Sequence, residues 1–166
     1  MESHPETIPG DGLTMLVAYD ASEEARSAMT AAARLLKPRK VLVVTAWEPS
    51  GLTAARAASA GGLRQPDWSE PEEGEEDPAY TEALATLKEG VQLADSLGLH
   101  SVGHLTESAQ SIWSALVDAA EELHPDVIVA GTRGVTGLRA LWQSSVADQL
   151  LKKSAIPVFI VPPVER

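Results

Sequence analysis

Short segments rich in apolar residues alternate along this chain with segments in which apolar residues recur every three or four positions. Most of the short segments are apolar on both faces, which is typical of strands buried in a parallel sheet. The longer segments have the spacing of amphipathic helices, and helices that connect parallel strands form right-handed crossovers. The pattern predicts an α/β fold with an open parallel sheet and helices on both faces. Its five expected strands are Leu13–Tyr19, Val41–Trp47, Ser101–Thr106, Asp126–Ala130 and Pro157–Val161.

The expected helices have residues at their ends that favour helix termini. Ser22 is expected to cap the first helix, because a serine hydroxyl accepts hydrogen bonds from free backbone N–H groups, and Pro38 ends that helix. The second helix ends before Gly98, which tolerates a left-handed backbone. Ser108 is expected to cap the third helix, and the last runs from about Ser145 to Lys153.

Two parts of the chain lack this periodicity. The first 12 residues are polar and carry two prolines, so we expect a disordered tail. Residues 48–78 are rich in alanine, glycine, proline and acidic residues, and we expect them to form a long, mobile, acidic loop. A single domain then accounts for residues 13–163.

The composition excludes several classes of protein. The formal net charge of -11 argues against nucleic-acid binding, which needs a basic surface against the phosphates. The absence of cysteine excludes disulfides and thiol chemistry. No segment approaches the roughly 20 apolar residues that cross a bilayer, and the polar N-terminus does not resemble a secretory signal. We therefore expect a cytoplasmic protein.

A glycine-rich segment, residues 131–137, directly follows the fourth expected strand. Glycines let backbone N–H groups approach a ligand closely, and the expected helix that starts near Ser144 and Ser145 offers further free N–H groups to a phosphate. Glycines after a strand also form ordinary tight turns, so a purely structural role stays open. The segment is neither a Walker A loop nor a Rossmann fingerprint.

Three segments together resemble the universal stress protein family. Asp20-Ala21-Ser22 after the first strand is similar to the family's Asp-Gly-Ser opening. Gly131, two residues, Gly134, nine residues and then Ser144-Ser145 resemble its ATP-binding signature. Ile156–Val161 is similar to its closing strand. The resemblance covers about residues 13–163, nearly the whole chain.

The resemblance implies a Rossmann-like fold with strand order 3-2-1-4-5 and a binding crevice between the first and fourth strands, where the direction of winding reverses. It implies that the protein binds ATP, or AMP or ADP, with or without Mg²⁺, and holds no metal through protein groups alone. Carried over by motif, Asp20 would face the base or ribose and Ala46 would offer backbone atoms to the adenine. Glycines would line the ribose and phosphates, and the start of the last helix would bind the phosphates. The residues of these last two groups are Gly131, Gly134, Ser144, Ser145 and Val146.

Two residues depart from the family pattern. Ser144 stands where ATP-binding members have a third glycine, so its side chain could intrude on the phosphates. Ala21 replaces the glycine of the opening motif. Asp20 could also act only as a helix cap.

Three functions remain open at this point. The chain could be a nucleotide-binding regulator of a stress response, or a protein of the same fold that binds no nucleotide and acts through an unidentified protein partner. It could also be a slow ATPase, although no pair of nucleophile and base is visible and we expect no catalytic residue. The family commonly dimerises through its last strand, so the resemblance implies a homodimer through Val158, Phe159, Ile160 and Val161.

Overall fold

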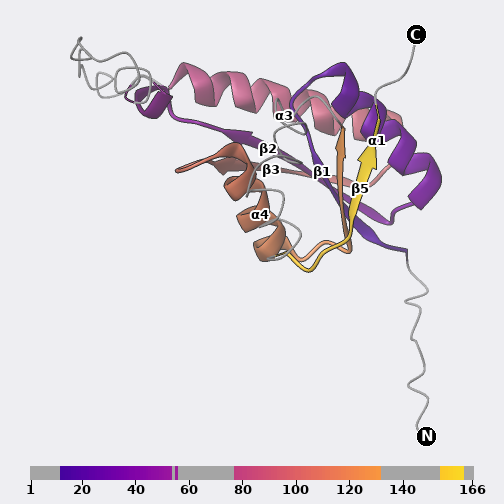
Figure 1. The fold of residues 1–166 in the computed structure, drawn as a ribbon. Helices are drawn as coiled ribbons and strands as arrows, with labels where there is room; N and C mark the ends of the chain where they lie inside the picture. Colours follow the sequence, from indigo (N-terminus) through magenta and orange to yellow (C-terminus); the bar gives the residue numbers. More distant parts are fainter. Residues whose placement is uncertain (1–11, 54, 56–76, 132–153, 163–166) are drawn as a thin grey trace, which may run out of the picture.

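The fold is a five-stranded parallel sheet of order β3-β2-β1-β4-β5, as a computed structural model of the protein shows (Figure 1). The structure describes residues 12–53, 55, 77–131 and 154–162. The α/β class, the parallel sheet and its order are therefore confirmed. The strands are β1 (Thr14–Ala18), β2 (Lys40–Trp47), β3 (Ser101–Glu107), β4 (Val127–Gly131) and β5 (Val158–Val161).

β1 lies at the centre of the sheet and is paired on both sides. Its Leu16 is in register with Leu42 of β2 and with Ile128 of β4. From β1 the chain winds outward through β2 to β3, then crosses back over the sheet to β4 and β5. The direction of winding therefore reverses between β1 and β4, at the position that the sequence predicted.

Helix α1 (Glu23–Leu36) begins and ends where the sequence predicts. The Ser22 hydroxyl accepts a hydrogen bond from the N–H of Ala25 at 3.1 Å, which confirms Ser22 as the N-cap. The helix ends at Lys37, which takes a left-handed backbone conformation with φ 46° directly before Pro38. Helix α3 (Pro78–Ser96) likewise ends before Gly98, whose φ is +75°.

Helix α4 (Ile112–Leu123) corrects one prediction. Its N-cap is Ser111, which exchanges hydrogen bonds with Ser114 in a capping box, and the expected cap Ser108 is wrong. The reason is that β3 continues to Glu107, so that Ser108 still follows the sheet: its N–H donates to the carbonyl of Trp47 at 2.8 Å. The Ser108 side chain is fully buried.

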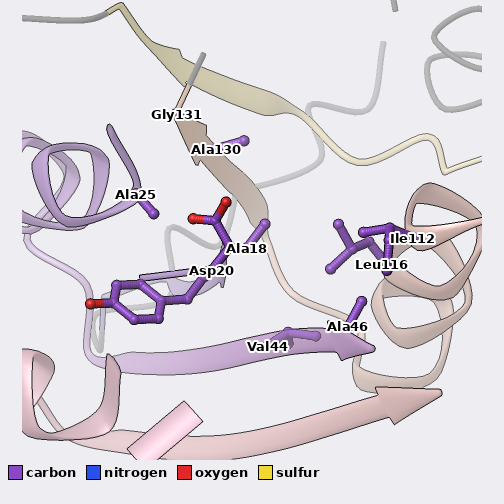
Figure 2. Close-up of a pocket in the computed structure, with 10 residues that line it drawn as sticks. Ala18, Asp20, Ala25, Val44, Ala46, Ile112, Leu116, Ala130 and Gly131 are labelled. Carbon is purple, nitrogen blue, oxygen red and sulfur yellow. The ribbon is translucent and has the colours of Figure 1, made fainter. Parts of the chain in front are cut away.

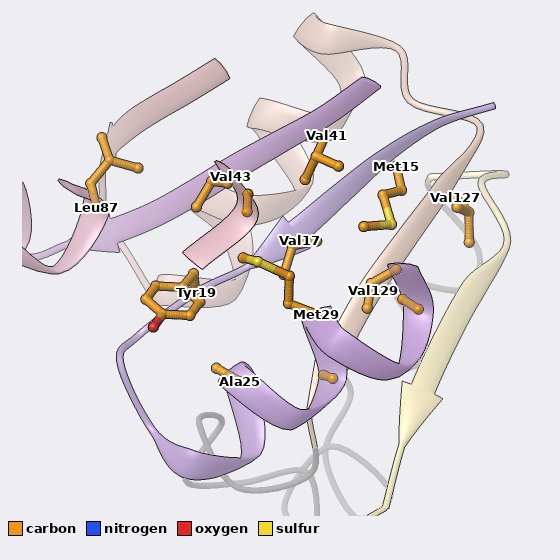
Figure 3. Packing of buried hydrophobic residues seen from close by; sticks show 13 residues of the cluster. Met15, Val17, Tyr19, Ala25, Met29, Val41, Val43, Leu87, Val127 and Val129 are labelled. Carbon is orange, nitrogen blue, oxygen red and sulfur yellow. The ribbon is translucent and has the colours of Figure 1, made fainter. Parts of the chain in front are cut away.

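The two faces of the sheet carry separate hydrophobic clusters. Helices α1 and α3 cover one face, where residues such as Met15 and Val17 of β1 pack against Met29 of α1 and Leu87 of α3 (Figure 3). Helix α4 covers the other face, where Leu16 packs with Leu116. Successive residues of β1 thus point into different layers, as the alternation of a strand requires.

The expected loop over residues 48–78 has ordered ends. Residues 50–53 are helical, and Asp77 is the N-cap of α3. Asp77 also accepts hydrogen bonds from the backbone N–H of Ser50, at 2.8 Å, and from its hydroxyl, so the two ends of the segment lie together. Residues 54 and 56–76 lie outside the described residues, as do residues 1–11 of the expected N-terminal tail and the expected last helix.

Among the helices that the structure describes, none combines the length and the apolar character needed to cross a membrane.

Candidate functional site

A pocket opens at the carboxyl ends of β1, β2 and β4, at the point where the winding of the sheet reverses (Figure 2). Open parallel sheets bind ligands at such a position because the loops that leave the neighbouring strands diverge there. The residues that line it are Ala18, Tyr19, Asp20, Ala25, Val44, Ala46, Ile112, Leu116, Ala130 and Gly131. Three residues expected from the sequence, Asp20, Ala46 and Gly131, are thus brought into one pocket.

Asp20 carries the charged side chain of this lining. It lies two residues beyond Ala18, the last residue of β1, and Figure 2 shows its carboxylate pointing toward Ala130 at the end of β4. Its Oδ1 accepts hydrogen bonds from the backbone N–H of Ser22, at 3.0 Å, and from the Ser22 hydroxyl, at 2.6 Å. Because Ser22 caps α1, these hydrogen bonds to Asp20 hold the capping residue in place. Within the described residues, Oδ2 of Asp20 has no hydrogen-bond partner.

The backbone of Ala46 faces the pocket because β1 ends before β2 does. The carbonyl of Val44 still accepts a hydrogen bond from the N–H of Tyr19, at 2.9 Å. In a parallel pair every second residue faces the same neighbour, so Ala46 also faces β1, beyond its last paired residue, Ala18. The Thr45 hydroxyl donates to the carbonyl of Tyr19 at 2.9 Å and so occupies the acceptor that would have continued the ladder.

Gly131 is a glycine for a reason of packing. A Cβ at this position would lie 2.5 Å from the carbonyl oxygen of Glu24, in the first turn of α1. Real Cβ atoms do not approach backbone so closely, and only a glycine lets β4 end against this helix. This packing role differs from the tight turn that the sequence left open, and it does not decide whether Gly131 also contacts a ligand.

The remaining walls of the pocket are apolar, and the sequence reading did not assign them to the site. Ile112 and Leu116 reach it from α4, and Val44 reaches it from β2, beside the expected residue Ala46 (Figure 2). Their spacing on α4 was visible as helical periodicity, which indicates a buried face but cannot tell a core from a pocket. Ile112 is the exception, since 36% of its surface is exposed at the start of the helix.

The universal stress protein family model matches residues 13–162. The chain belongs to this family. A curated relative, a universal stress protein of Methanocaldococcus jannaschii, is 31% identical over 80 residues, which are 48% of this chain and 46% of that protein. The chain therefore spans less than half of that relative.

Two solved structures of universal stress proteins share the fold. One, from Archaeoglobus fulgidus in complex with dAMP, has a TM-score of 0.58 and 23% identity, and the match covers 90% of this chain and 98% of that one. The other, from Arabidopsis thaliana with AMP bound, has a TM-score of 0.58 and 14% identity, and the match covers 92% of each chain. Structural relatives of this universal stress protein therefore bind adenine nucleotides.

The second half of the expected site cannot be placed. Gly134, Ser144, Ser145 and Val146 lie outside the described residues. The resemblance implied that Gly131 and Gly134 line the ribose and phosphates and that the start of the last helix binds the phosphates, and of these residues only Gly131 is described. Within residues 12–53, 77–131 and 154–162, no group of three or more acidic residues or histidines could hold a metal ion.

Proposed function

We propose that this protein binds an adenine nucleotide in the pocket between β1 and β4 and acts as a nucleotide-binding regulator in a stress response. The observation that carries the proposal is the convergence of Asp20, Ala46 and Gly131, which come from the carboxyl ends of three different strands, on one pocket. The complexes of the two relatives with dAMP and AMP support the same class of ligand.

The chemistry of the lining suits a nucleoside. The apolar side chains of Val44, Ile112 and Leu116 match the flat apolar faces of adenine. The backbone of Ala46 can pair with the edge of the base, because its N–H and carbonyl face a position that no strand fills. The Oδ2 of Asp20 can accept a hydrogen bond from a ribose hydroxyl or from the amino group of the base.

The net charge of the chain bears on the choice among nucleotides. A triphosphate brings more negative charge than a monophosphate to a protein whose own formal charge is -11. We therefore expect ATP to require Mg²⁺ for its best affinity, and AMP to show no such requirement.

Calorimetric titration of the whole protein with AMP, with ATP and with ATP plus Mg²⁺ tests the proposal. We expect Asp20→Asn to weaken binding about tenfold or more, because a hydrogen bond to a charged acceptor is lost. Asparagine keeps an oxygen for Ser22, so the cap of α1 survives. The control is Asp118→Asn, which removes the same charge from the exposed side of α4.

A second variant tests the position of the ligand. Ile112→Trp enlarges a half-exposed side chain at the mouth of the pocket and should block binding while the fold persists; Glu121→Trp, on the exposed side of the same helix, should not. If the wild-type protein takes up none of the three ligands and its melting temperature stays constant in their presence, the pocket serves no adenine nucleotide. Interaction with a protein partner then becomes the favoured function.

We further infer that two copies pair through β5. Within the described part of the chain, β5 is bonded to β4 alone, and 40% of the surface of Ile160 is exposed on this edge strand. A short apolar edge strand presents free N–H and carbonyl groups to a second copy.

A further inference from the structure

Tyr19 lies between the pocket and the layer of helices on the opposite face of the sheet. It directly precedes Asp20, but its side chain points into the opposite layer, where 98% of its surface is buried between α1 and α3 (Figure 3). The alternation of a strand produces this split, since adjacent residues face opposite sides of the sheet. Whatever fixes the Tyr19 ring therefore fixes the residue that enters the pocket.

The ring sits against a gap that α3 leaves for it. A Cβ at Gly90 would lie 2.7 Å from Cδ1 of Tyr19 and 2.8 Å from Cγ1 of Val43. Glycine inside a helix lowers its stability relative to alanine. The close approach of the Tyr19 ring explains why Gly90 stands in the middle of α3, since a larger residue there would displace the ring.

The hydroxyl of Tyr19 is held by an ion pair between two helices. It donates a hydrogen bond to Oε1 of Glu89 on α3 at 2.7 Å, and Arg26 of α1 donates to the same oxygen from Nε at 2.8 Å. A second guanidinium nitrogen of Arg26 lies 2.6 Å from that oxygen. Burial of the ring and then the hydrogen bond to Glu89 raise the pKa of Tyr19 to about 12, so the hydroxyl remains a donor at neutral pH.

The backbone of Tyr19 also makes two hydrogen bonds to β2. Its N–H donates to the carbonyl of Val44, and its carbonyl accepts from the hydroxyl of Thr45, each at 2.9 Å. Tyr19, the residue after β1, is thus still hydrogen-bonded to β2 through its backbone. Asp20 is the first residue of the turn that leaves the sheet, and the turn ends two residues later at Ser22, the N-cap of α1.

We propose that Tyr19 is a positioning residue for the pocket, and that its hydrogen bond to Glu89 on α3 fixes the direction in which Asp20 presents its carboxylate to a ligand. The proposal rests on the proposed function for its consequence, which is affinity for an adenine nucleotide. Its structural part concerns the protein without ligand and can be tested alone.

Tyr19→Phe is the variant of choice because it removes the hydroxyl and keeps the ring beside Gly90. The chain has two tyrosines, and the other one provides a matched control. Tyr80 contacts the ring of Trp47 edge-on at 5.4 Å, so Tyr80→Phe makes the same chemical change on α3 away from Asp20. Glu89→Ala removes the acceptor from the other side and should act like Tyr19→Phe.

Titration with AMP measures the consequence. We expect Tyr19→Phe to weaken AMP binding about threefold to tenfold, the range of a single net hydrogen bond, while Tyr80→Phe binds like the wild type. In a double-mutant cycle, Tyr19→Phe should cause no further loss when Asp20 is already asparagine, because Tyr19 acts through the Asp20 carboxylate. An equal loss with and without Asp20 would overturn the proposal and leave Tyr19 a purely structural residue.

Amide NMR of the protein without ligand separates this proposal from the proposed function. Tyr19→Phe should shift the amide signals of Asp20, Ala21 and Ser22 and speed their hydrogen exchange, and Tyr80→Phe should leave them unchanged. If the wild type binds no nucleotide but these amides respond, the proposed function fails and the positioning role stands. If they do not respond, the positioning role is wrong even for a protein that binds AMP.

Discussion

A single residue, Ala21, carries a backbone conformation that its side chain disfavours. Its φ is +60°, in the left-handed region, and it stands where the family's opening motif has glycine. An L-residue with a Cβ is strained there by roughly 1–2 kcal/mol, and glycine is not. The turn nevertheless keeps this shape, because Tyr19 is tied to the sheet before it and Ser22 caps α1 after it.

We therefore expect Ala21→Gly to stabilise the protein by about 0.5–1 kcal/mol, the strain relieved less the extra chain entropy of glycine. Ala33→Gly is the control with the opposite sign. Ala33 lies in the interior of α1, where glycine should destabilise by about 1 kcal/mol. Urea unfolding of the two variants and the wild type measures both changes. A loss of stability in Ala21→Gly would show that the turn is not strained.

At this scale the sequence predicts residues that follow strands and misses contacts between distant residues. The resemblance to the family's motifs implied the roles of Asp20, Ala46 and Gly131, and the apolar runs that precede them predicted the strands at whose ends they lie. The partnership of Tyr19 and Glu89 joins residues 70 positions apart, and neither residue type signals it. The contact depends on how α3 packs over β2, which no local pattern determines.

Among the elements, α3 contacts residues beside two strands of the pocket. Tyr19, which follows β1, donates a hydrogen bond to Glu89 of this helix. Trp47, which follows Ala46 in β2, contacts the ring of Tyr80. The helix also holds the base of the segment that connects it to β2, through the bonds between Asp77 and Ser50.

The cap of α3 should make the protein's stability depend on pH. The hydroxyl of Ser50, and then its backbone N–H, lower the pKa of Asp77 in the folded protein. A carboxyl whose pKa is lower in the folded than in the unfolded state stabilises the fold above its unfolded value, about pH 4. That contribution is lost as the pH falls through the lower, folded value.

We expect Asp77→Ala to lower the free energy of unfolding by about 1–2 kcal/mol at pH 7, as for the loss of other N-caps. The difference from the wild type should narrow as the pH falls toward 3. Asp118→Ala, at an exposed position on α4, should cause little change at either pH. Urea titrations at pH 7, 5 and 3 measure this, and a constant difference across that range would contradict a role for the charge of Asp77.

For the elements, the sequence predicted type and order better than ends. The apolar periodicity predicted α1, and Ser22 predicted its start, because it is the only serine at that boundary. Before α4 there are several serines, and Ser108, Ser111 and Ser114 could each have begun the helix. Only the length of β3, which is set by its pairing with β2 up to Trp47, decides among them.

On the scale of the whole sheet, β3 and β5 are the two edge strands among the residues that the structure describes. Each exposes one large apolar side chain, Val102 with 43% of its surface and Ile160 with 40%. Both side chains lie on the α4 face of the sheet. Val102 is in register with Leu42, and Val158, which faces the same side of β5 as Ile160, is in register with Ile128. Leu42 and Ile128 both belong to the cluster on the α4 face. The two edges differ in composition: β3 carries His104 and ends at Glu107, whereas β5 consists of apolar residues alone.

This difference predicts which edge forms the proposed dimer. A lysine in place of an apolar edge residue disfavours the pairing of two edge strands, because its charge would lie against the apolar side chains of the partner strand. We expect sedimentation to give a dimer for the wild type and for Val102→Lys, and a monomer for Ile160→Lys. All three proteins should keep the same circular dichroism spectrum, since both positions are exposed in the single chain. A dimer that Val102→Lys dissociates and Ile160→Lys does not would place the interface at β3, and a monomeric wild type would leave β5 free for another partner.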